Sequence, residues 1–124
     1  MSVIVVIEDT LENARLAEKL LRRAGHEVIL ASDGETGLTT VFTQTPDLIL
    51  VDLGLPDMDG QTVVAIMRQQ DNLQTIPIIA FTAWPEDTAA SMAQAYGCDG
   101  VILKPINTRT FAEQVVQFIG QNQA

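Results

Sequence analysis

Five short apolar runs recur along the chain and constrain its fold more than any other feature. They are rich in β-branched residues, show no alternation with polar residues, and lie at residues 3–7, 28–31, 48–51, 78–81 and 101–103. Such runs predict strands that are buried on both faces. The segments between them carry apolar residues at helical spacing, and Gly25 and Gly97 stand where helices would end in a left-handed residue. This alternation favours an α/β fold with a five-stranded parallel sheet, doubly wound with helices on both faces.

Length and cysteine content indicate a single domain. A chain of 124 residues with 47% hydrophobic residues can bury a core of its own, whereas a closed βα barrel would need about twice this length. Cys98 is the only cysteine, so neither a disulfide framework nor a cysteine zinc site can form within the chain. We expect one domain over residues 1–121, followed by a short polar tail at 122–124.

The charge of the chain argues against several classes of partner. Acidic residues outnumber basic ones and give a formal net charge of −9, which disfavours contact with nucleic acid phosphates and anionic lipid. No apolar stretch approaches the roughly 18 residues of a membrane helix, and the N-terminus lacks the basic start of a signal peptide. Together with the single cysteine, these features predict a cytoplasmic protein that binds neither nucleic acid nor membrane.

Polar side chains follow four of the five predicted strands. Glu8 and Asp9 follow the first strand, Asp52 the third, Thr82 the fourth and Lys104 the fifth. Parallel strands end at a shared edge of the sheet, where the ligands of open α/β folds bind. We therefore expect these carboxylates, the hydroxyl and the ammonium group to converge.

The chemistry of this group follows from its charges. Clustered carboxylates repel one another, and Lys104 supplies only one positive charge. A hard divalent cation would supply the rest, and Mg²⁺ suits a site of carboxylates, a backbone carbonyl, water and a phosphoryl oxygen. Asp52 beside Mg²⁺ and a lysine is the natural nucleophile, so we expect it to form an aspartyl phosphate.

Four short motifs stand in order after the predicted strands. They are the Glu8-Asp9 pair, the segment VDLGLPDMDG at residues 51–60, the Thr82-Ala83 pair and the Lys104-Pro105 pair. Together they resemble the receiver domains of bacterial two-component response regulators, above all stand-alone receivers of the chemotaxis and cell-division kinds. The resemblance implies a flavodoxin-like (βα)5 fold with strand order 2-1-3-4-5, and a role as a phosphorylation-dependent switch in a phosphorelay.

The resemblance assigns a role to each matching residue. Asp52 would accept the phosphoryl group from a phosphohistidine of a sensor histidine kinase or a histidine phosphotransfer protein. Asp9, Asp52 and the Gly54 backbone carbonyl would bind Mg²⁺, and Glu8 would act through a bound water. Lys104 would pair with the phosphoryl oxygens.

The resemblance also implies how the signal leaves the site. Thr82 would hydrogen-bond the phosphoryl group and draw the loop at Ala83 inward, and the Lys104–Pro105 peptide bond is expected to be cis. A downstream target protein would then read the altered surface. Such a domain phosphorylates and slowly dephosphorylates itself and is not an enzyme acting on other substrates. We expect a monomer or a weak homodimer.

Val101 and Trp84 depart from the family pattern, and Gly54 is considered together with Trp84. Val101 stands where receivers that switch through an aromatic ring carry Tyr or Phe, so the switch is expected to rely on backbone movement around Ala83. The resemblance also implies that Trp84 and Gly54 occupy the two positions beside the path of an attacking water. The bulky indole is expected to shield the phosphoryl group and slow its hydrolysis, whereas Gly54 leaves its own side open.

The residues leave other functions open. A Mg²⁺-dependent phosphohydrolase of the haloacid dehalogenase class also uses an aspartate nucleophile, but that class needs a second Asp where this chain has Gly54. A receiver-like binding module that is never phosphorylated and a flavodoxin-like carrier are further alternatives. The complete set of Asp9, Asp52, Thr82 and Lys104 argues against the module that is never phosphorylated. The acidic loop after the first strand argues against the flavodoxin-like carrier.

The loop after Asp52 is rich in residues that form turns. Asp57 and Asp59 stand beside Pro56 and Gly60 in this segment. We therefore interpret both aspartates as turn-forming residues and not as metal ligands.

Overall fold

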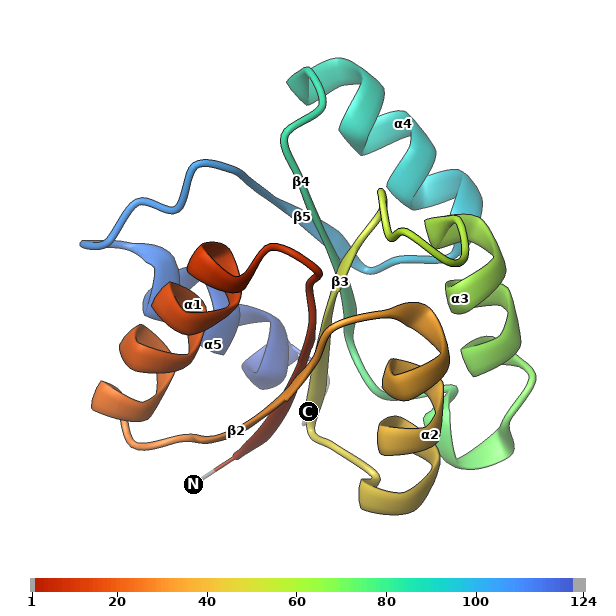
Figure 1. Cartoon of the computed structure of the whole chain (residues 1–124), viewed down its shortest axis with the longest axis horizontal. Coiled ribbons are helices and arrows are strands. Elements are labelled where there is room, and N and C mark those ends of the chain that lie inside the picture. The colour runs from red at the N-terminus through yellow and green to blue at the C-terminus, as the bar shows by residue number, and fades with distance from the viewer. Residues whose placement is uncertain (1, 122–124) are drawn as a thin grey trace.

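A parallel sheet forms the centre of the molecule, and helices flank it on both sides (Figure 1). The computed structural model describes residues 2–121, so the predicted polar tail at 122–124 lies outside the described residues. In chain order the elements are β1 (Val3–Ile7), α1 (Leu11–Arg23), β2 (Glu27–Ala31), α2 (Gly34–Gln44), β3 (Leu48–Asp52), α3 (Gly60–Arg68), the 3-10 helix η1 (Asp71–Leu73), β4 (Ile78–Thr82), α4 (Glu86–Tyr96), β5 (Gly100–Leu103) and α5 (Phe111–Gln121).

The five strands are all parallel and stand in the order β2-β1-β3-β4-β5, which confirms the flavodoxin-like α/β fold. Their register aligns the ends of neighbouring strands. Ile7 pairs with Val51, and Thr82 pairs with Leu103. The residues that follow β1 and β5, and those that end β3 and β4, therefore lie along one edge of the sheet.

Both faces of the sheet are apolar because helices cover both (Figure 1). Helices α1 and α5 pack on the face that includes Ile4, Leu50 and Phe81. Helices α2 and α3, together with η1, pack on the opposite face, which includes Val5 and Val51. Helix α4 packs over β4 through Ala93 and Ala80. Since successive strand residues point to opposite faces, covering both faces explains the lack of polar alternation in the apolar runs.

Two of the predicted site residues lie inside strands and not after them. Strands β3 and β4 each extend one residue beyond their apolar runs, so Asp52 and Thr82 are the last residues of their strands. Only 7% of the Asp52 surface and 2% of the Thr82 surface are exposed. The sequence placed both residues just after their strands, and the structure places them one position earlier in the element, as the last strand residue. The backbone of both residues is therefore held within the sheet.

Among the described residues, three helices are followed by a residue in the left-handed conformation. Two of these residues are the glycines that the sequence predicted, and the third is not a glycine. Gly97 comes directly after α4, and Gly25 lies two residues after the last residue of α1; their φ angles of 92° and 94° are in the left-handed region that favours glycine. Helix α2 ends at Gln44 and is followed by Thr45, a non-glycine residue with a φ of 44°, where no glycine marks the end in the sequence. Within residues 2–121, none of the helices has the length and apolar character of a membrane span.

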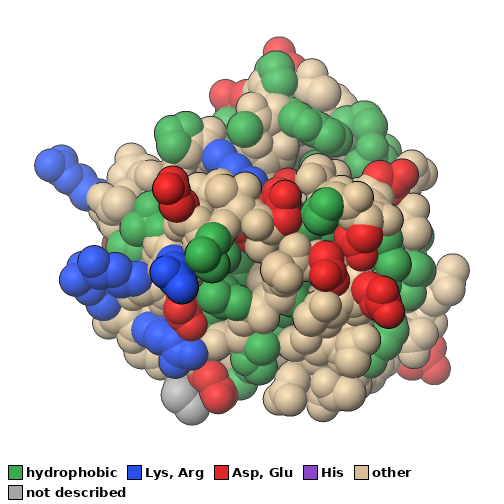
Figure 2. Space-filling model, viewed as in Figure 1, with side chains coloured by type: hydrophobic (Ala, Val, Ile, Leu, Met, Phe, Trp, Pro, Cys, Tyr) green, Lys and Arg blue, Asp and Glu red, His purple; other side chains and the backbone are tan. Residues whose placement is uncertain are grey.

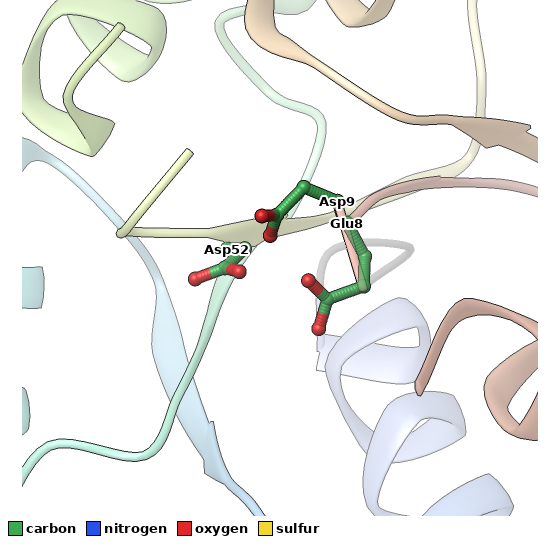
Figure 3. Close-up of side chains that lie close together, drawn as sticks. All are labelled: Glu8, Asp9 and Asp52. Atoms are coloured by element: carbon green, nitrogen blue, oxygen red, sulfur yellow. The ribbon is translucent and has the colours of Figure 1, made fainter. Parts of the chain in front are cut away.

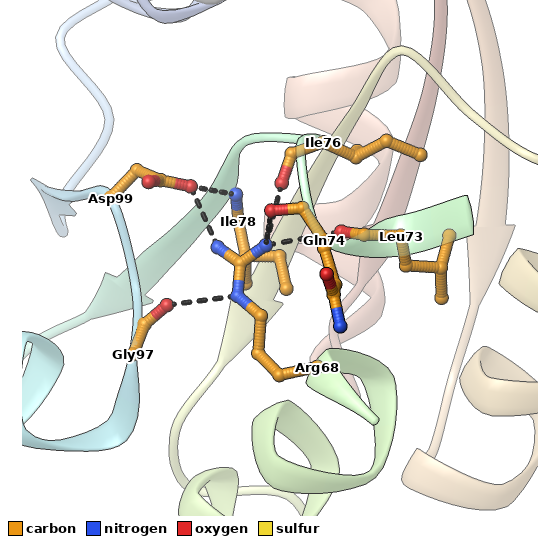
Figure 4. Close-up of polar contacts among 7 residues, drawn as sticks. All are labelled: Arg68, Leu73, Gln74, Ile76, Ile78, Gly97 and Asp99. Atoms are coloured by element: carbon orange, nitrogen blue, oxygen red, sulfur yellow. Dashed lines mark hydrogen bonds and ion pairs between the residues drawn. The ribbon is translucent and has the colours of Figure 1, made fainter. Parts of the chain in front are cut away.

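Arg68, at the end of α3, joins several segments at the amino-terminal edge of the sheet (Figure 4). Its guanidinium group pairs with the Asp99 carboxylate at 2.8 Å, and Asp99 also accepts the backbone N–H of Ile78 at 2.9 Å. The guanidinium group further donates, at 3.0 to 3.2 Å, to the backbone carbonyls of Leu73, Gln74, Ile76 and Gly97. One side chain thus connects α3, η1, the end of α4 and the start of β4.

Replacing Arg68 with Ala is expected to lower the free energy of unfolding by about 2–4 kcal/mol, because several backbone carbonyls lose a charged donor. Urea unfolding followed by circular dichroism measures this change. Arg109→Ala removes an exposed arginine and serves as the control, with an expected change within about 0.5 kcal/mol. Equal stability of the two variants would show that the Arg68 contacts do not stabilise the fold.

Candidate functional site

Three carboxylates gather at the carboxyl-terminal edge of the sheet. Glu8 and Asp9 follow β1, and Asp52 ends the neighbouring strand β3. Oxygens of all three side chains lie within 4.8 Å of one another, and Figure 3 shows the carboxylates turned toward a common space. Glu8 and Asp52 are buried, whereas Asp9 is exposed to solvent. The structure thus brings together the carboxylates that the sequence predicted to converge.

Lys104 enters the cluster from the end of β5 and forms its positive centre. Its ammonium nitrogen Nζ lies 2.5 Å from Glu8 Oε1 and 3.1 Å from Asp52 Oδ2. The backbone N–H of Lys104 donates to the carbonyl of Thr82 at 2.8 Å. The peptide bond between Lys104 and Pro105 is cis, as the resemblance implied. The lysine is therefore held through both its backbone and its side chain.

Burial and mutual contact shift the pKa values of these groups. Burial, together with the hydrogen bond to Asp52, raises the pKa of Glu8 to about 7. Burial also acts to raise the pKa of Asp52, but hydrogen bonds with Glu8 and the Gly54 N–H, and the charge of Lys104, outweigh it and lower that pKa. For Lys104, burial acts to lower the pKa, and the contacts with Glu8 and Asp52 raise it. Near neutral pH, the metal-free site therefore holds an ionised Asp52, a charged Lys104 and a partly protonated Glu8.

Thr82 and Trp84 connect the site to a small apolar cluster. Thr82 is buried at the end of β4, and its hydroxyl accepts the backbone N–H of Trp84 at 3.1 Å. The Trp84 side chain is half-buried and, like that of Val101, packs against three buried residues, Leu53, Ala80 and Ala93. The indole therefore contacts the layer between the sheet and α4, next to the edge that carries the site.

Gly54 lies directly beside the Asp52 carboxylate. Its backbone N–H donates to Asp52 Oδ1 at 2.9 Å. A Cβ atom at position 54 would lie 3.7 Å from the same oxygen. A larger residue would therefore border the carboxylate, whereas glycine adds no side-chain atom there.

Asp57 and Asp59 do more than shape a turn, which extends the sequence interpretation. Asp59 caps α3 by accepting the N–H of Thr62 at 2.8 Å. Asp57 accepts the N–H of Gly34 at 2.8 Å and that of Glu35 at 3.0 Å, at the start of α2. These two bonds, that of Gly34 first, lower the pKa of Asp57. An Asp directly before a helix is a readable capping signal, but no sequence signal pairs Asp57 with a residue 23 positions away.

The donor set of the cluster suits a hard divalent cation. Glu8, Asp9 and Asp52 each offer a carboxylate oxygen, the kind of ligand that Mg²⁺ prefers in proteins. Lys104 leaves two negative charges uncompensated when all three carboxylates are ionised. The exposed Asp9 connects the cluster with solvent. The residues present therefore fit the Mg²⁺ expected from the sequence.

A surface hollow of about 180 Å³ borders the cluster. Glu8 and Asp9 line it together with residues of α1, the segment at Ser32 and the first turn of α2. A larger hollow of about 580 Å³ lies at the other end of α1, beside α5, and is lined by Ala24 and His26 but by none of the site residues. Only the smaller hollow is therefore connected with the acidic cluster.

Glu8 predicts a pH dependence of stability in the metal-free protein. Its pKa rises from an ordinary value of 4.5 to about 7 on folding, so between these values the folded state binds more protons than the unfolded chain. Stability is therefore expected to fall as the pH rises from about 5 to about 7. Asp52, whose pKa is lowered from 3.8, acts below this window and leaves the sign unchanged.

Urea unfolding in EDTA, repeated across this pH range, tests the assignment. Glu8→Gln removes the titrating group, so its stability is expected to depend less on pH than that of the wild type. Glu12→Gln removes an exposed carboxylate on α1 and is the matched control, expected to keep the wild-type dependence. The same slope in all three proteins would contradict the raised pKa of Glu8.

Comparison with known proteins agrees with this geometry. The response regulator receiver domain family matches residues 4–116. The polar-differentiation response regulator DivK of Brucella anthropi is 32% identical over 117 residues, which cover 94% of this chain and 95% of that protein. Among solved structures, the chemotaxis response regulator CheY4 of Vibrio cholerae is 25% identical with a TM-score of 0.90, and covers 95% of this chain and 98% of its own. A two-component response regulator from Clostridium difficile is 26% identical, with a TM-score of 0.89 and 100% of both chains covered. The chain therefore belongs to the response regulator receiver domain family of two-component signalling.

Proposed function

We propose that this receiver domain is a phosphorylation-dependent switch, in which Asp52 accepts a phosphoryl group from a phosphohistidine with the help of Mg²⁺. The observation that carries the proposal is the setting of the Asp52 carboxylate. It ends β3, lies 3.1 Å from Lys104 Nζ, and stands within 4.8 Å of oxygens of Glu8 and Asp9. Phosphoryl transfer depends mainly on such positioning and on electrostatic stabilisation.

The transfer itself needs little covalent chemistry from the protein. A carboxylate oxygen of Asp52 forms a bond to phosphorus as the bond between phosphorus and the histidine nitrogen breaks, and the electron pair of that bond leaves with the imidazole. The lowered pKa keeps Asp52 ionised for this step. Lys104, already 3.1 Å from Asp52 Oδ2, can donate to the phosphoryl oxygens with little movement.

The cation would be held by Asp9, Asp52 and the Gly54 backbone carbonyl, with Glu8 acting through a bound water. When bound, Mg²⁺ neutralises the charge that builds up on the phosphoryl oxygens. Glu8 has a second task that does not depend on the metal, because its buried carboxylate holds Lys104 at 2.5 Å. This contact aims the ammonium group at the Asp52 side of the cluster.

Thr82 and the loop after it form the proposed output. The Thr82 hydroxyl accepts the N–H of Trp84 and keeps its own proton for a new acceptor. Phosphorylation adds about −1.5 to −2 charges and several strong acceptors, which would draw this hydroxyl inward together with Ala83. Trp84 would follow, and its side chain packs on the same apolar cluster as Val101. The indole thus offers the switch a ring that Val101 does not supply.

The partners of the switch follow from its chemistry. A sensor histidine kinase or a histidine phosphotransfer protein would supply the phosphoryl group, and a downstream target protein would read the changed surface. The net charge of −9 favours protein partners over nucleic acid or an anionic membrane. The acting unit in this proposal is the receiver domain at residues 1–121, working as a monomer or a weak homodimer.

Gly54 and Lys104 favour the switch over the alternatives. A phosphohydrolase of the haloacid dehalogenase class needs an acid two residues after the nucleophile, and Gly54 has no side chain to donate a proton. In a carrier for a flavin phosphate, the carboxylates of Glu8 and Asp9 at the ligand edge would repel the phosphate.

Intact mass spectrometry after incubation with Mg²⁺ and acetyl phosphate tests the proposal directly. The wild type is expected to gain the mass of one phosphoryl group, and Asp52→Asn is expected to gain none, because an amide is a poor nucleophile. Asp71→Asn, which changes an aspartate in η1 at the opposite edge of the sheet, is the matched control and should be modified like the wild type. A wild type that gains no mass would favour the receiver-like module that is not phosphorylated.

Trp84 is expected to slow the loss of the phosphoryl group by restricting the approach of water. In Trp84→Ala, dephosphorylation should become about three to ten times faster, which corresponds to roughly 0.7–1.4 kcal/mol of barrier. Trp84→Phe keeps a ring at this position and should stay closer to the wild type. The measurement follows the decay of the phosphorylated mass after removal of acetyl phosphate. An unchanged rate in Trp84→Ala would show that the indole does not shield the site.

A further inference from the structure

The loop between β3 and α3 is fastened to the start of α2 by a single side chain. Asp57 Oδ1 accepts the N–H of Gly34 at 2.8 Å, and Asp57 Oδ2 accepts the N–H of Glu35 at 3.0 Å. Both carboxylate oxygens are thus engaged with backbone that lies 22 to 23 residues earlier in the chain. This two-point contact fixes the direction of the carboxylate as well as its position.

Helix α2 depends on this contact for its first turn. The first N–H groups of a helix have no partner within the helix, and a negative charge near them is favourable. Asp33 satisfies only the N–H of Thr36, at 2.7 Å, and Asp57 satisfies the two N–H groups before it. The helix is also rich in Gly and Thr, which have low helix propensity, so its start relies on caps more than usual.

The loop in turn packs closely on the start of α2. A Cβ atom at Gly34 would lie 3.0 Å from the sulfur of Met58, so glycine allows the two segments to approach this closely. Leu55 of the same loop is buried among the apolar residues under α2 and α3. Hydrogen bonds and packing therefore act together on the segment from 53 to 59.

Both sides of this junction reach the acidic cluster. The loop begins at Asp52 and contains Gly54, whose N–H donates to Asp52 Oδ1. On the other side, the first turn of α2 lines the hollow that Glu8 and Asp9 also line. Acidic side chains gather over this end of α2 in Figure 2. Asp57 thus stands between the two parts of the molecule that border the proposed metal site.

We propose that Asp57 is a positioning residue, which holds the loop carrying Gly54 against α2 and thereby keeps the site in the arrangement that binds Mg²⁺. The inference rests on the proposed function, since it concerns the cation of the same site. Asp57 acts through the loop and is not itself a ligand, because its two oxygens are already bound to backbone N–H groups. The role of its carboxylate is therefore to keep the loop in one conformation.

Two isosteric substitutions separate position from charge. Asp57→Asn leaves one acceptor oxygen where two are needed, so one of the bonds to α2 is lost. Asp59→Asn removes the same charge from the same loop but keeps an oxygen that can cap α3 at Thr62. Any effect of net charge on the metal should be similar in both variants, and only Asp57→Asn should release the loop.

Isothermal titration calorimetry with Mg²⁺, and hydrogen exchange of the metal-free proteins, give the two readouts. We expect Asp57→Asn to bind Mg²⁺ about three to ten times more weakly than Asp59→Asn, a smaller loss than the roughly 10- to 100-fold typical of a direct hydrogen-bond partner of a metal ligand, because Asp57 acts through the loop. We also expect faster exchange at Gly34 and Glu35 and across residues 53–58 in Asp57→Asn alone. Both readouts remain available if either variant is less stable, provided that circular dichroism shows it to be folded.

The outcomes distinguish this inference from the function on which it rests. Equal Mg²⁺ affinity in the two variants would overturn the inference, even with faster exchange, because Asp57 would then be only a cap of α2. Weaker Mg²⁺ binding without faster exchange would overturn it as well, since the loop would not have been released. Failure of the wild type to gain a phosphoryl group on Asp52 would instead overturn the proposed function and leave the role of Asp57 in Mg²⁺ binding standing.

Discussion

The ammonium group of Lys104, held between Glu8 and Asp52, is the contact on which the site depends. Two carboxylates buried this close would otherwise repel each other, and burial alone would drive both toward protonation. Lys104 acts to lower the pKa of both, and the hydrogen bond between them, which raises the pKa of Glu8 and lowers that of Asp52, leaves Asp52 ionised and Glu8 partly protonated near neutral pH. Phe81, whose ring centre lies 4.9 Å from the ammonium nitrogen, adds an apolar wall that excludes water from one side. An ionised carboxylate is thus maintained inside a domain whose net charge is strongly negative.

The parallel sheet makes this contact possible because it aligns strand ends from distant parts of the chain. β1, β3, β4 and β5 end in register, so Glu8, Asp52, Thr82 and Lys104 meet at one edge although they span most of the sequence. Asp52 and Thr82 belong to the strands themselves, which limits how far their backbones can move. Asp9, Gly54 and Trp84 lie instead in the loops that follow β1, β3 and β4. The same edge of the sheet therefore combines residues that belong to strands with residues that belong to loops.

The sequence predicted the features that depend on local pattern and missed those that depend on distant pairing. Apolar runs, the glycines after α1 and α4, and the polar residues at strand ends are written in short segments, and all led to the observed fold and cluster. The contacts of Asp57 with α2 and of Arg68 with Asp99 join segments that are 22 to 31 residues apart in the sequence, and no local sequence pattern predicts them. The left-handed conformation of Thr45 is local, but the sequence did not predict it because glycine is the usual residue in this conformation.

Arg68 and Trp84 contact opposite ends of α4. The two ends are held differently, and this bears on how the proposed switch would move the helix. The C-terminal end is held, because the carbonyl of Gly97 accepts a bond from Arg68. The N-terminal end begins after Pro85, whose side chain offers no capping bond, and only Ala89 and Ala93 of the helix are buried. Just before this end of the helix, Trp84 donates its backbone N–H to the Thr82 hydroxyl and packs against the cluster of Leu53, Ala80 and Ala93. In the proposed switch, a displacement at Thr82 would therefore act on the start of α4, where Trp84 would supply the aromatic ring that Val101 does not.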